Sequence, residues 1–287
     1  LAIGKGDKTN SVGSDAIALA GIAKQIIFLE DGDFAILNDE LINIYDLNGN
    51  NIKREVKPNS LDPAVISKGN YRHFMQKEIY EQPETISHTI SEMYNNDGKI
   101  SDNLSKIIGH NPKSLTILAA GTSYYAGLIG KYWIESLAEI PVNVEIASEF
   151  RYRKPFIDPD GLIITISQSG ESIDTLMAMR YAQASGIKSL SIINSIGSTI
   201  DRESDYSIFT RAGAEIAVAS TKAFTAQLIS LLSICLALAE RKQKNLKEIE
   251  TIKSKLFKIP GAVAKALSSE SKIIDIASNI VKSKSCL

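Results

Sequence analysis

Residues Leu162–Thr175 read LIITISQSGESIDT, and this stretch decides the fold class. Its first part, Leu162–Ile166, is an apolar run typical of a strand that is buried on both faces. A helical pattern begins at about Ile173, so the strand passes almost directly into a helix. Units of this kind build parallel sheets that helices cover on both sides.

The turn between this strand and this helix is rich in hydrogen-bonding side chains. It contains Ser167, Gln168, Ser169 and Ser172, with Gly170 among them. Because neither Lys nor Arg occurs there, an anion would be bound by hydroxyls, backbone N–H groups and the helix dipole. The loop has more polar groups than one helix start can use, so we favour phosphate binding over simple N-capping.

The same alternation of strands and helices extends over residues 114–240. It predicts a three-layer αβα fold around one parallel sheet. No dinucleotide fingerprint, Walker-A spacing or serine-hydrolase elbow is present. The 3 histidines lack metal-ligand spacing, so no metal site is expected. The other expected elements are strands at Leu115–Ala120, Val142–Ala147, Ser189–Ile193 and Tyr206–Phe209, and a long helix at about Ser220–Ala239.

Two further loops have similar chemistry. Ala120–Ser123 follows the first expected strand, and Val218–Lys222 opens the long helix. Since ligands bind outside the carboxyl ends of parallel strands, these loops and the serine-rich loop should meet at one edge of the sheet. Any one of them alone would be an ordinary helix cap, but the three together favour a ligand site.

The segments on either side follow other patterns. Residues 1–66 are rich in strands, and residues 71–109 and 241–282 have helical patterns. Residues 57–68 contain two prolines and form the expected linker. The chain does not begin with Met, so we interpret it as a piece of a longer protein. The N-terminal strands are expected at Gln25–Leu29, Phe34–Leu37 and Leu41–Tyr45, separated by turn-type clusters that suggest hairpins.

Composition argues against several function classes. The formal net charge of −1, from 32 Lys and Arg against 33 Asp and Glu, indicates neither nucleic acid nor an anionic membrane as a partner. Cys235 and Cys286 cannot form a disulfide framework, which fits a reducing cytoplasm. The apolar run Ala226–Ala239 is shorter than the roughly 20 residues of a membrane-spanning helix. We find no signal peptide.

Five contiguous motifs stand along the chain: YRHFMQKEIYEQP at Tyr71–Pro83, GTSY at Gly121–Tyr124, VEIASEFRYR at Val144–Arg153, SQSGE at Ser167–Glu171 and VASTKAFT at Val218–Thr225. Together they resemble one known family. In this order they are similar to the glucosamine-6-phosphate synthases, the isomerising glutamine–fructose-6-phosphate aminotransferases, over essentially the whole chain. Two positions depart from the family pattern: Ala120 stands where Cys is usual, and Ser172 stands where Thr is common.

The resemblance implies a domain organisation. Residues 1–66 would be the tail of a hydrolase-type N-terminal glutaminase domain, and residues 67–113 a linker with leading helices. Residues 114–240 would be the first SIS (sugar isomerase) domain. Residues 241–287 would be a helical connector and the opening strand of a second SIS domain. The family's glutaminase cysteine and its isomerase acid and base residues have no counterpart here, so we assign no catalytic residue to this chain.

The resemblance also implies a ligand. The expected ligand is fructose 6-phosphate or glucosamine 6-phosphate, with glutamine used by the parent enzyme, which would be a cytoplasmic homodimer without a cofactor. Two other functions stay open: a non-catalytic SIS-type sugar-phosphate sensor, and a related enzyme that removes the amino group. Neither would need the strand-rich first 66 residues. The expected contacts are Gly121, Thr122, Ser123, Ser167, Gln168, Ser169, Ser172, Val218, Ala219 and Ser220.

Overall fold

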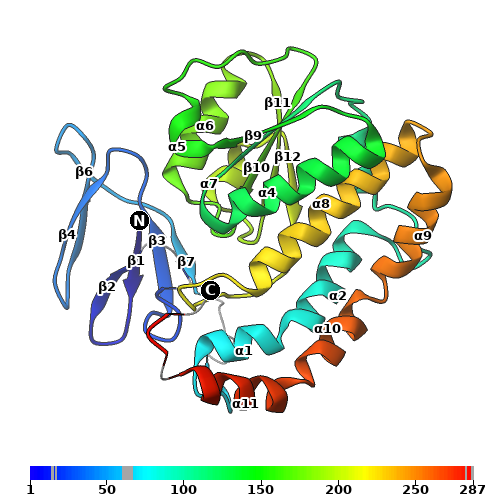
Figure 1. Ribbon diagram of the computed structural model, residues 1–287. Helices are drawn as coiled ribbons and strands as arrows, with labels where there is room; N and C mark the ends of the chain where they lie inside the picture. The colour runs from blue at the N-terminus through cyan, green and yellow to red at the C-terminus, as the bar shows by residue number, and fades with distance from the viewer. Residues whose placement is uncertain (14–15, 17, 60–66, 282, 286–287) are drawn as a thin grey trace. The chain divides into compact units, whose positions relative to one another are not determined.

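The computed structural model describes residues 1–13, 16, 18–59, 67–281 and 283–285. The chain divides into two compact units, Leu1–His73 and Phe74–Leu287. Strands make up the regular structure of the first unit, and helices around one parallel sheet make up the second (Figure 1).

Two antiparallel sheets form the first unit. One has the strand order β2-β1-β3-β7 and the other β4-β5-β6. Buried residues from both sheets, Ile3, Ile27 and Ile44, form one cluster, so the sheets pack against each other. The strands are β1 (Ala2–Lys5), β2 (Asn10–Gly13), β3 (Gln25–Phe28), β4 (Phe34–Leu37), β5 (Ile42–Tyr45), β6 (Asn51–Ile52) and β7 (Val56–Pro58).

The three strands expected in this unit are present as β3, β4 and β5. β4 and β5 form an antiparallel hairpin, as expected. The hairpin expected between β3 and β4 is wrong, because β3 pairs with β1 and β7 instead. Ile26 and Ile27 of β3 are both buried, so this strand needs the central position that β1 and β7 provide. Of the expected linker, Lys57 and Pro58 belong to β7, and residues 60–66 lie outside the described part of the chain.

Five parallel strands form the sheet of the second unit, in the order β12-β11-β10-β8-β9. This confirms the expected α/β class. All six residues of β10 are buried, because β10 is the central strand and its run of apolar residues suits contact on both faces. The strands are β8 (Leu115–Ala119), β9 (Val142–Ile146), β10 (Leu162–Ser167), β11 (Lys188–Ile193) and β12 (Tyr206–Phe209).

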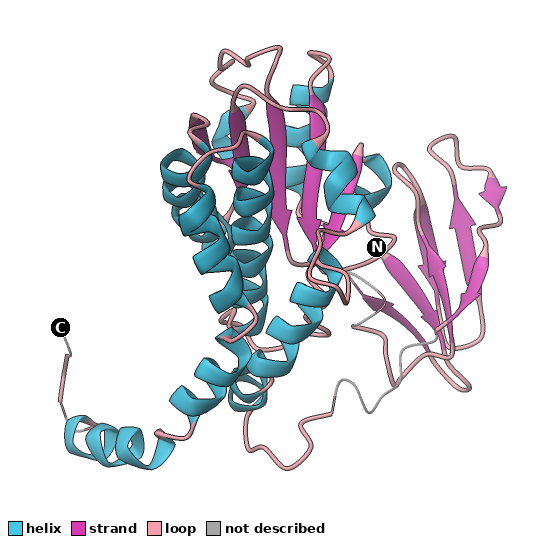
Figure 2. Ribbon diagram, turned by 90° about the vertical axis from the view of Figure 1, so that its right-hand side faces the viewer, coloured by secondary structure: helices cyan, strands magenta, loops and turns pink. Residues whose placement is uncertain are grey.

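Helices cover both faces of this sheet (Figure 2). One cover consists of α2 (Gln82–Met93), α3 (Asp102–Ile108), α4 (Gly121–Trp133), a π-helical segment η1 (Ile134–Ala138) and α8 (Lys222–Arg241). The other consists of α5 (Ala147–Phe150), α6 (Ile173–Gln183) and α7 (Thr199–Glu203). The short helix α7 was not expected from the sequence.

Four further helices lie outside these layers. α1 (Phe74–Tyr80) precedes α2, and α9 (Leu246–Leu256), α10 (Ile259–Leu267) and α11 (Glu270–Ile280) follow α8. α10 packs against α2. Residues 283–285 form no strand, and residues 282, 286 and 287 lie outside the described part of the chain, where the opening strand of a second SIS domain was expected.

α8 is long and apolar enough to cross a membrane by length and composition, yet 72% of its most apolar window is buried in the fold. It contacts α2, α4 and η1, so its apolar residues belong to the core. Cys235 of α8 is fully buried. Loss of solvent around this thiol raises its pKa to about 12.

The strand order creates a topological switch between β8 and β10. From β8 the chain continues to β9 on one side, and from β10 it continues to β11 and β12 on the other. β8 and β10 are paired in parallel, with Ala119 opposite Ile166. The loops that follow them therefore leave the sheet side by side, at the position where open α/β sheets bind ligands.

Gly170 shapes the loop after β10. Its φ of +67° lies in the left-handed region, and a Cβ at this position would come within 2.0 Å of Ser198 Oγ and 2.6 Å of Ser198 Cβ. We predict that Gly170→Ala lowers the free energy of unfolding of the second unit by about 2–4 kcal/mol, from backbone strain plus the clash. Urea unfolding followed by the fluorescence of the single tryptophan, Trp133, measures this loss.

Gly186→Ala is the matched control. Gly186 also has a positive φ, +81°, but nothing lies within 4 Å of its Cβ position. Its replacement should cost only the backbone strain, about 1–2 kcal/mol. Equal losses in the two variants would show that Ser198 does not crowd position 170.

A second prediction concerns Cys235. The thiolate is the reactive form of cysteine, and a pKa of about 12 leaves little thiolate at pH 8. In a Cys286→Ser background, a thiol reagent at pH 8 should leave the native protein unlabelled and should label it after unfolding in guanidinium. Labelling of native protein at the rate of the unfolded chain would contradict the buried placement.

Candidate functional site

The serine-rich loop after β10 is closed by its own hydroxyls. The oxygen of Ser167 accepts a hydrogen bond from Gly170 N–H at 3.1 Å, and the oxygen of Ser169 accepts one from Glu171 N–H at 3.1 Å. A hydroxyl that accepts in this way still has its own hydrogen to donate. Both serines can therefore shape the loop and donate to a ligand at once.

The helix that follows this loop, α6, begins without a side-chain cap. Ser172 occupies the N-cap position, but its hydroxyl accepts from Thr175 Oγ1 at 3.2 Å and from no backbone N–H of the helix. The first N–H groups of a helix have no partner within the helix and carry partial positive charge. N-capping therefore does not explain Ser172, and the arrangement suits a bound anion.

The loop after β8 also leads into an uncapped helix. Ala120 is the N-cap of α4 and makes no side-chain cap, and Gly121 has a φ of +57°. Thr122 is exposed, whereas Ser123 is buried and its hydroxyl accepts from Gln227 Nε2 at 3.0 Å. Two helix N-termini without side-chain caps thus stand at the switch point, one on each neighbouring strand.

The segment before α8 is different, because a carboxylate already caps this helix. Glu215 Oε1 accepts from the N–H groups of Thr221 at 2.8 Å and Ala223 at 3.2 Å. Ser220 donates its hydroxyl to Glu215 Oε2 at 2.9 Å, so this hydroxyl is turned toward the protein. Val218 and Ala219 are exposed to solvent.

Lys222 is the only cation in the three loops, and it is not directed at a ligand. Its side chain is 5% exposed, and its ammonium pairs with Glu81 at 2.7 Å. The serine-rich loop contains no Lys or Arg, and Lys222 therefore does not supply a positive charge to it.

Asn194, which the sequence analysis did not single out, ties the serine-rich loop to the segment after β12. Its N–H donates to Gln168 O at 3.2 Å, and its side-chain Nδ2 donates to Gly213 O at 2.7 Å. Its Oδ1 accepts from Ala212 N–H at 2.8 Å. Asn194 directly follows β11, which is a third strand end. This position in the sequence could have marked it as a candidate for the site.

The segment before α8 reaches the other loops through the packing of α8. β12 is an edge strand two places from β10, so sheet order alone does not bring residues 218–220 to the switch point. α8 packs along α4, and the hydrogen bond from Gln227 to Ser123 joins the second turn of α8 to the first turn of α4. This contact and the bridge through Asn194 connect all three predicted loops.

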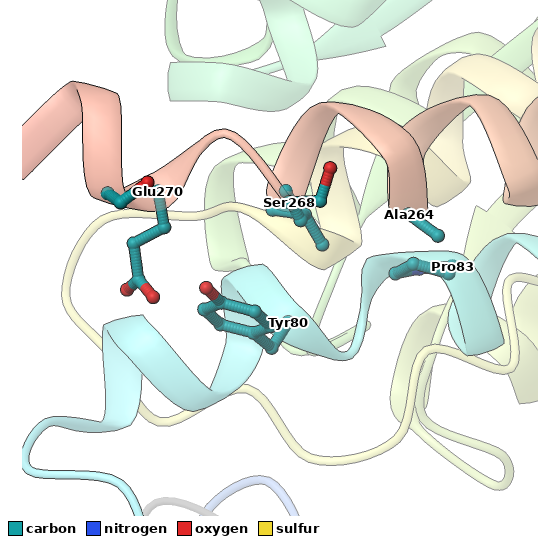
Figure 3. A pocket seen from close by; sticks show the side chains of 7 residues that line it. Tyr80, Pro83, Ala264, Ser268 and Glu270 are labelled. Carbon is teal, nitrogen blue, oxygen red and sulfur yellow. The ribbon is translucent and has the colours of Figure 1, made fainter.

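A separate cavity of about 520 Å³ lies between the α1–α2 junction and the α10–α11 junction (Figure 3). In its wall, Glu270 Oε1 accepts from Gln76 Nε2 at 3.3 Å. None of the ten predicted contact residues lines this cavity, so it is distinct from the strand-end loops. Its lining consists of Tyr80, Pro83, Ala264, Leu267, Ser268, Glu270 and Ser271.

Comparison with known proteins identifies the domain and the family. A model of the SIS domain matches residues 110–237. The glutamine–fructose-6-phosphate aminotransferase (isomerising) of Haemophilus influenzae is 44% identical over 98% of this chain, which spans 47% of that protein. The enzyme of the same name from Neisseria meningitidis is 44% identical over the whole chain, which spans 48% of it.

A solved structure, the C-terminal domain of glucosamine-fructose-6-phosphate aminotransferase from Francisella tularensis, is also similar. It matches 75% of this chain with 41% identity and a TM-score of 0.70, and the match covers 61% of that domain. The chain thus spans about half the length of the curated relatives. By sequence and by fold it belongs to the family of the isomerising glutamine–fructose-6-phosphate aminotransferases, and its parallel sheet with the covering helices is a SIS domain.

Proposed function

We propose that this chain is the sugar-phosphate-binding part of an enzyme that converts fructose 6-phosphate and glutamine into glucosamine 6-phosphate and glutamate. One observation carries the proposal: α4 and α6 begin without side-chain caps at the switch point of the sheet, with serine hydroxyls beside them. A phosphate group satisfies free helix N–H groups and hydroxyl donors together.

The phosphate in this proposal is bound by the loop after β10. Ser167 and Ser169 donate their free hydroxyl hydrogens, while Gln168 and Ser172 contribute from the ends of the loop. N–H groups in the first turn of α6 complete the set of donors. The phosphate negative charge is stabilised by these dipoles without a lysine or arginine.

The sugar would extend from the phosphate toward the other two loops. Gly121 and Thr122 at the start of α4 are exposed to it, and Ser123 fixes that turn through Gln227. Val218 and Ala219 would face the sugar with backbone groups, and Ser220 would act through its bond to Glu215.

The reaction requires opening of the sugar ring and proton transfer between adjacent carbons, which is general acid–base chemistry. Residues of this chain would contribute by binding and orientation. Binding energy gained at a remote phosphate can fix the position of the reacting carbons, and it can thereby lower the barrier of the chemical step.

A sugar-phosphate sensor and an amino-group-removing enzyme could use the same phosphate loop. The similarity to the aminotransferases extends over 98% of the chain, so it includes the strand-rich unit Leu1–His73. Neither alternative has a use for that unit, which favours the aminotransferase. For the parent protein we further propose glutamine as the nitrogen donor, a homodimer and a cytoplasmic location.

We predict that Ser167→Ala combined with Ser169→Ala weakens fructose 6-phosphate binding about a hundredfold. Two hydrogen bonds to a charged phosphate are lost, and each contributes about 1.5–3 kcal/mol. Calorimetric titration of the 287-residue chain measures the affinity, with fructose and inorganic phosphate as separate ligands. Binding should require the phosphate and should be strengthened by the sugar.

The matched control is Ser136→Ala combined with Ser185→Ala. Both serines are exposed; Ser136 lies in η1, which follows α4, and Ser185 lies two residues beyond the end of α6. This control should bind like the wild type. Equal affinity of the Ser167/Ser169 variant and the wild type would refute the phosphate site, and failure of the wild type to bind at millimolar ligand would refute the proposed function of this chain.

A further inference from the structure

We propose that Glu78 and Glu81 are positioning residues for the exposed segment Val218–Ala219. The carboxylate of Glu78 is buried and that of Glu81 is partly exposed, and the two fix the segment from both sides. This inference rests on the proposed function, because that function gives the segment its ligand. It also assigns a physical role to the motif Tyr71–Pro83, which lies far from the strand ends in sequence.

Glu78 binds the backbone immediately before the exposed segment. Its Oε1 accepts from Ile216 N–H at 2.6 Å and from Ala217 N–H at 3.0 Å. The residue is only 1% exposed, although it carries a carboxylate. Two protein donors to Oε1 thus replace part of the water that this carboxylate loses on burial.

Glu81 binds the residue that begins the helix after the exposed segment. Its Oε2 pairs with the buried ammonium of Lys222 at 2.7 Å. Since Glu78 and Glu81 are three residues apart around the end of α1, they can reach the same stretch of chain. Ile216 and Ala217 on one side and Lys222 on the other thus have partners from one short piece of the molecule.

The segment needs such partners because it belongs to no helix or strand. Between Phe209, the end of β12, and Lys222, the start of α8, no regular element provides hydrogen bonds. Asn194 binds Ala212 and Gly213, and Glu78 binds Ile216 and Ala217. Glu215 binds residues 220, 221 and 223. Val218, whose side chain lies entirely in solvent, depends on this framework for its position.

The yellow segment that leads into α8 passes beside α1, which is drawn in cyan, in the close view of Figure 3. Glu78 Oε2 has no hydrogen-bond partner among the described residues, so only Oε1 holds the loop. A glutamine at this position would keep an acceptor oxygen for the two N–H groups. Alanine would remove the acceptor, and aspartate, one methylene shorter, would withdraw it.

Hydrogen exchange and calorimetry on the 287-residue chain test the role of Glu78 together. In Glu78→Ala, we expect the amides of Ile216 and Ala217 to exchange about tenfold faster or more, because they lose a hydrogen bond to a charged group. Affinity for fructose 6-phosphate should fall about tenfold as the backbone of Val218 and Ala219 loses its fixed position. Exchange in the loop Ser167–Ser172 should not change.

Two variants separate positioning from general stability. Glu78→Gln should recover most of the protection at Ile216 and Ala217 and most of the affinity, whereas Glu78→Asp should resemble Glu78→Ala. Glu84→Ala, which removes an exposed carboxylate from the adjacent helix α2, should behave as the wild type in both measurements.

Wild-type exchange at Ile216 and Ala217 in Glu78→Ala would overturn the inference, as would faster exchange with unchanged affinity. If Glu78→Ala does not fold, the same exchange and affinity measurements on Glu78→Asp test the inference. If the wild type binds no fructose 6-phosphate, the proposed function fails, and exchange at Ile216 and Ala217 alone then decides whether Glu78 holds the loop.

Discussion

Parallel pairing of β8 with β10 is the constraint on which the candidate site depends. It places the ends of two strands side by side at the point where the chain order reverses, so both following helices begin at one edge of the sheet. β10 is buried along its whole length, which makes a shift in register costly. The serine-rich loop and the start of α4 are therefore held together by the most buried part of the molecule.

At this edge of the sheet, carboxylates accept hydrogen bonds from some backbone N–H groups, while the N–H groups at two helix starts have no side-chain partner. Glu215 caps α8, Glu78 binds the backbone before it, and Glu171 accepts from Thr199 N–H at the start of α7. The starts of α4 and α6 receive no such side chain. The protein thus satisfies its own donors where it needs a fixed loop, and it leaves donors free where an anion fits.

The sequence predicted the positions of helices and strands more reliably than the pairing of the strands. The strands of the parallel sheet were placed within one or two residues because buried parallel strands read as continuous apolar runs. β1 and β2 were not predicted. The pairing of β3 with β1 could not be predicted from the local sequence, because the pattern of one strand does not specify which strand pairs with it. α7 was also not anticipated, since one and a half turns give no helical period to detect.

By itself, the sequence determined the α/β class, the serine-rich loop between strand and helix, and the family, because apolar periodicity and contiguous motifs are local properties of the chain. Only the tertiary structure decided which helix starts are free. Ser172 and Ser220 both precede helices, yet one leaves its helix uncapped and the other binds Glu215. Asn194 binds Ala212 across 18 residues of sequence and Glu78 binds Ile216 across 138, so their roles exist only once the chain is folded.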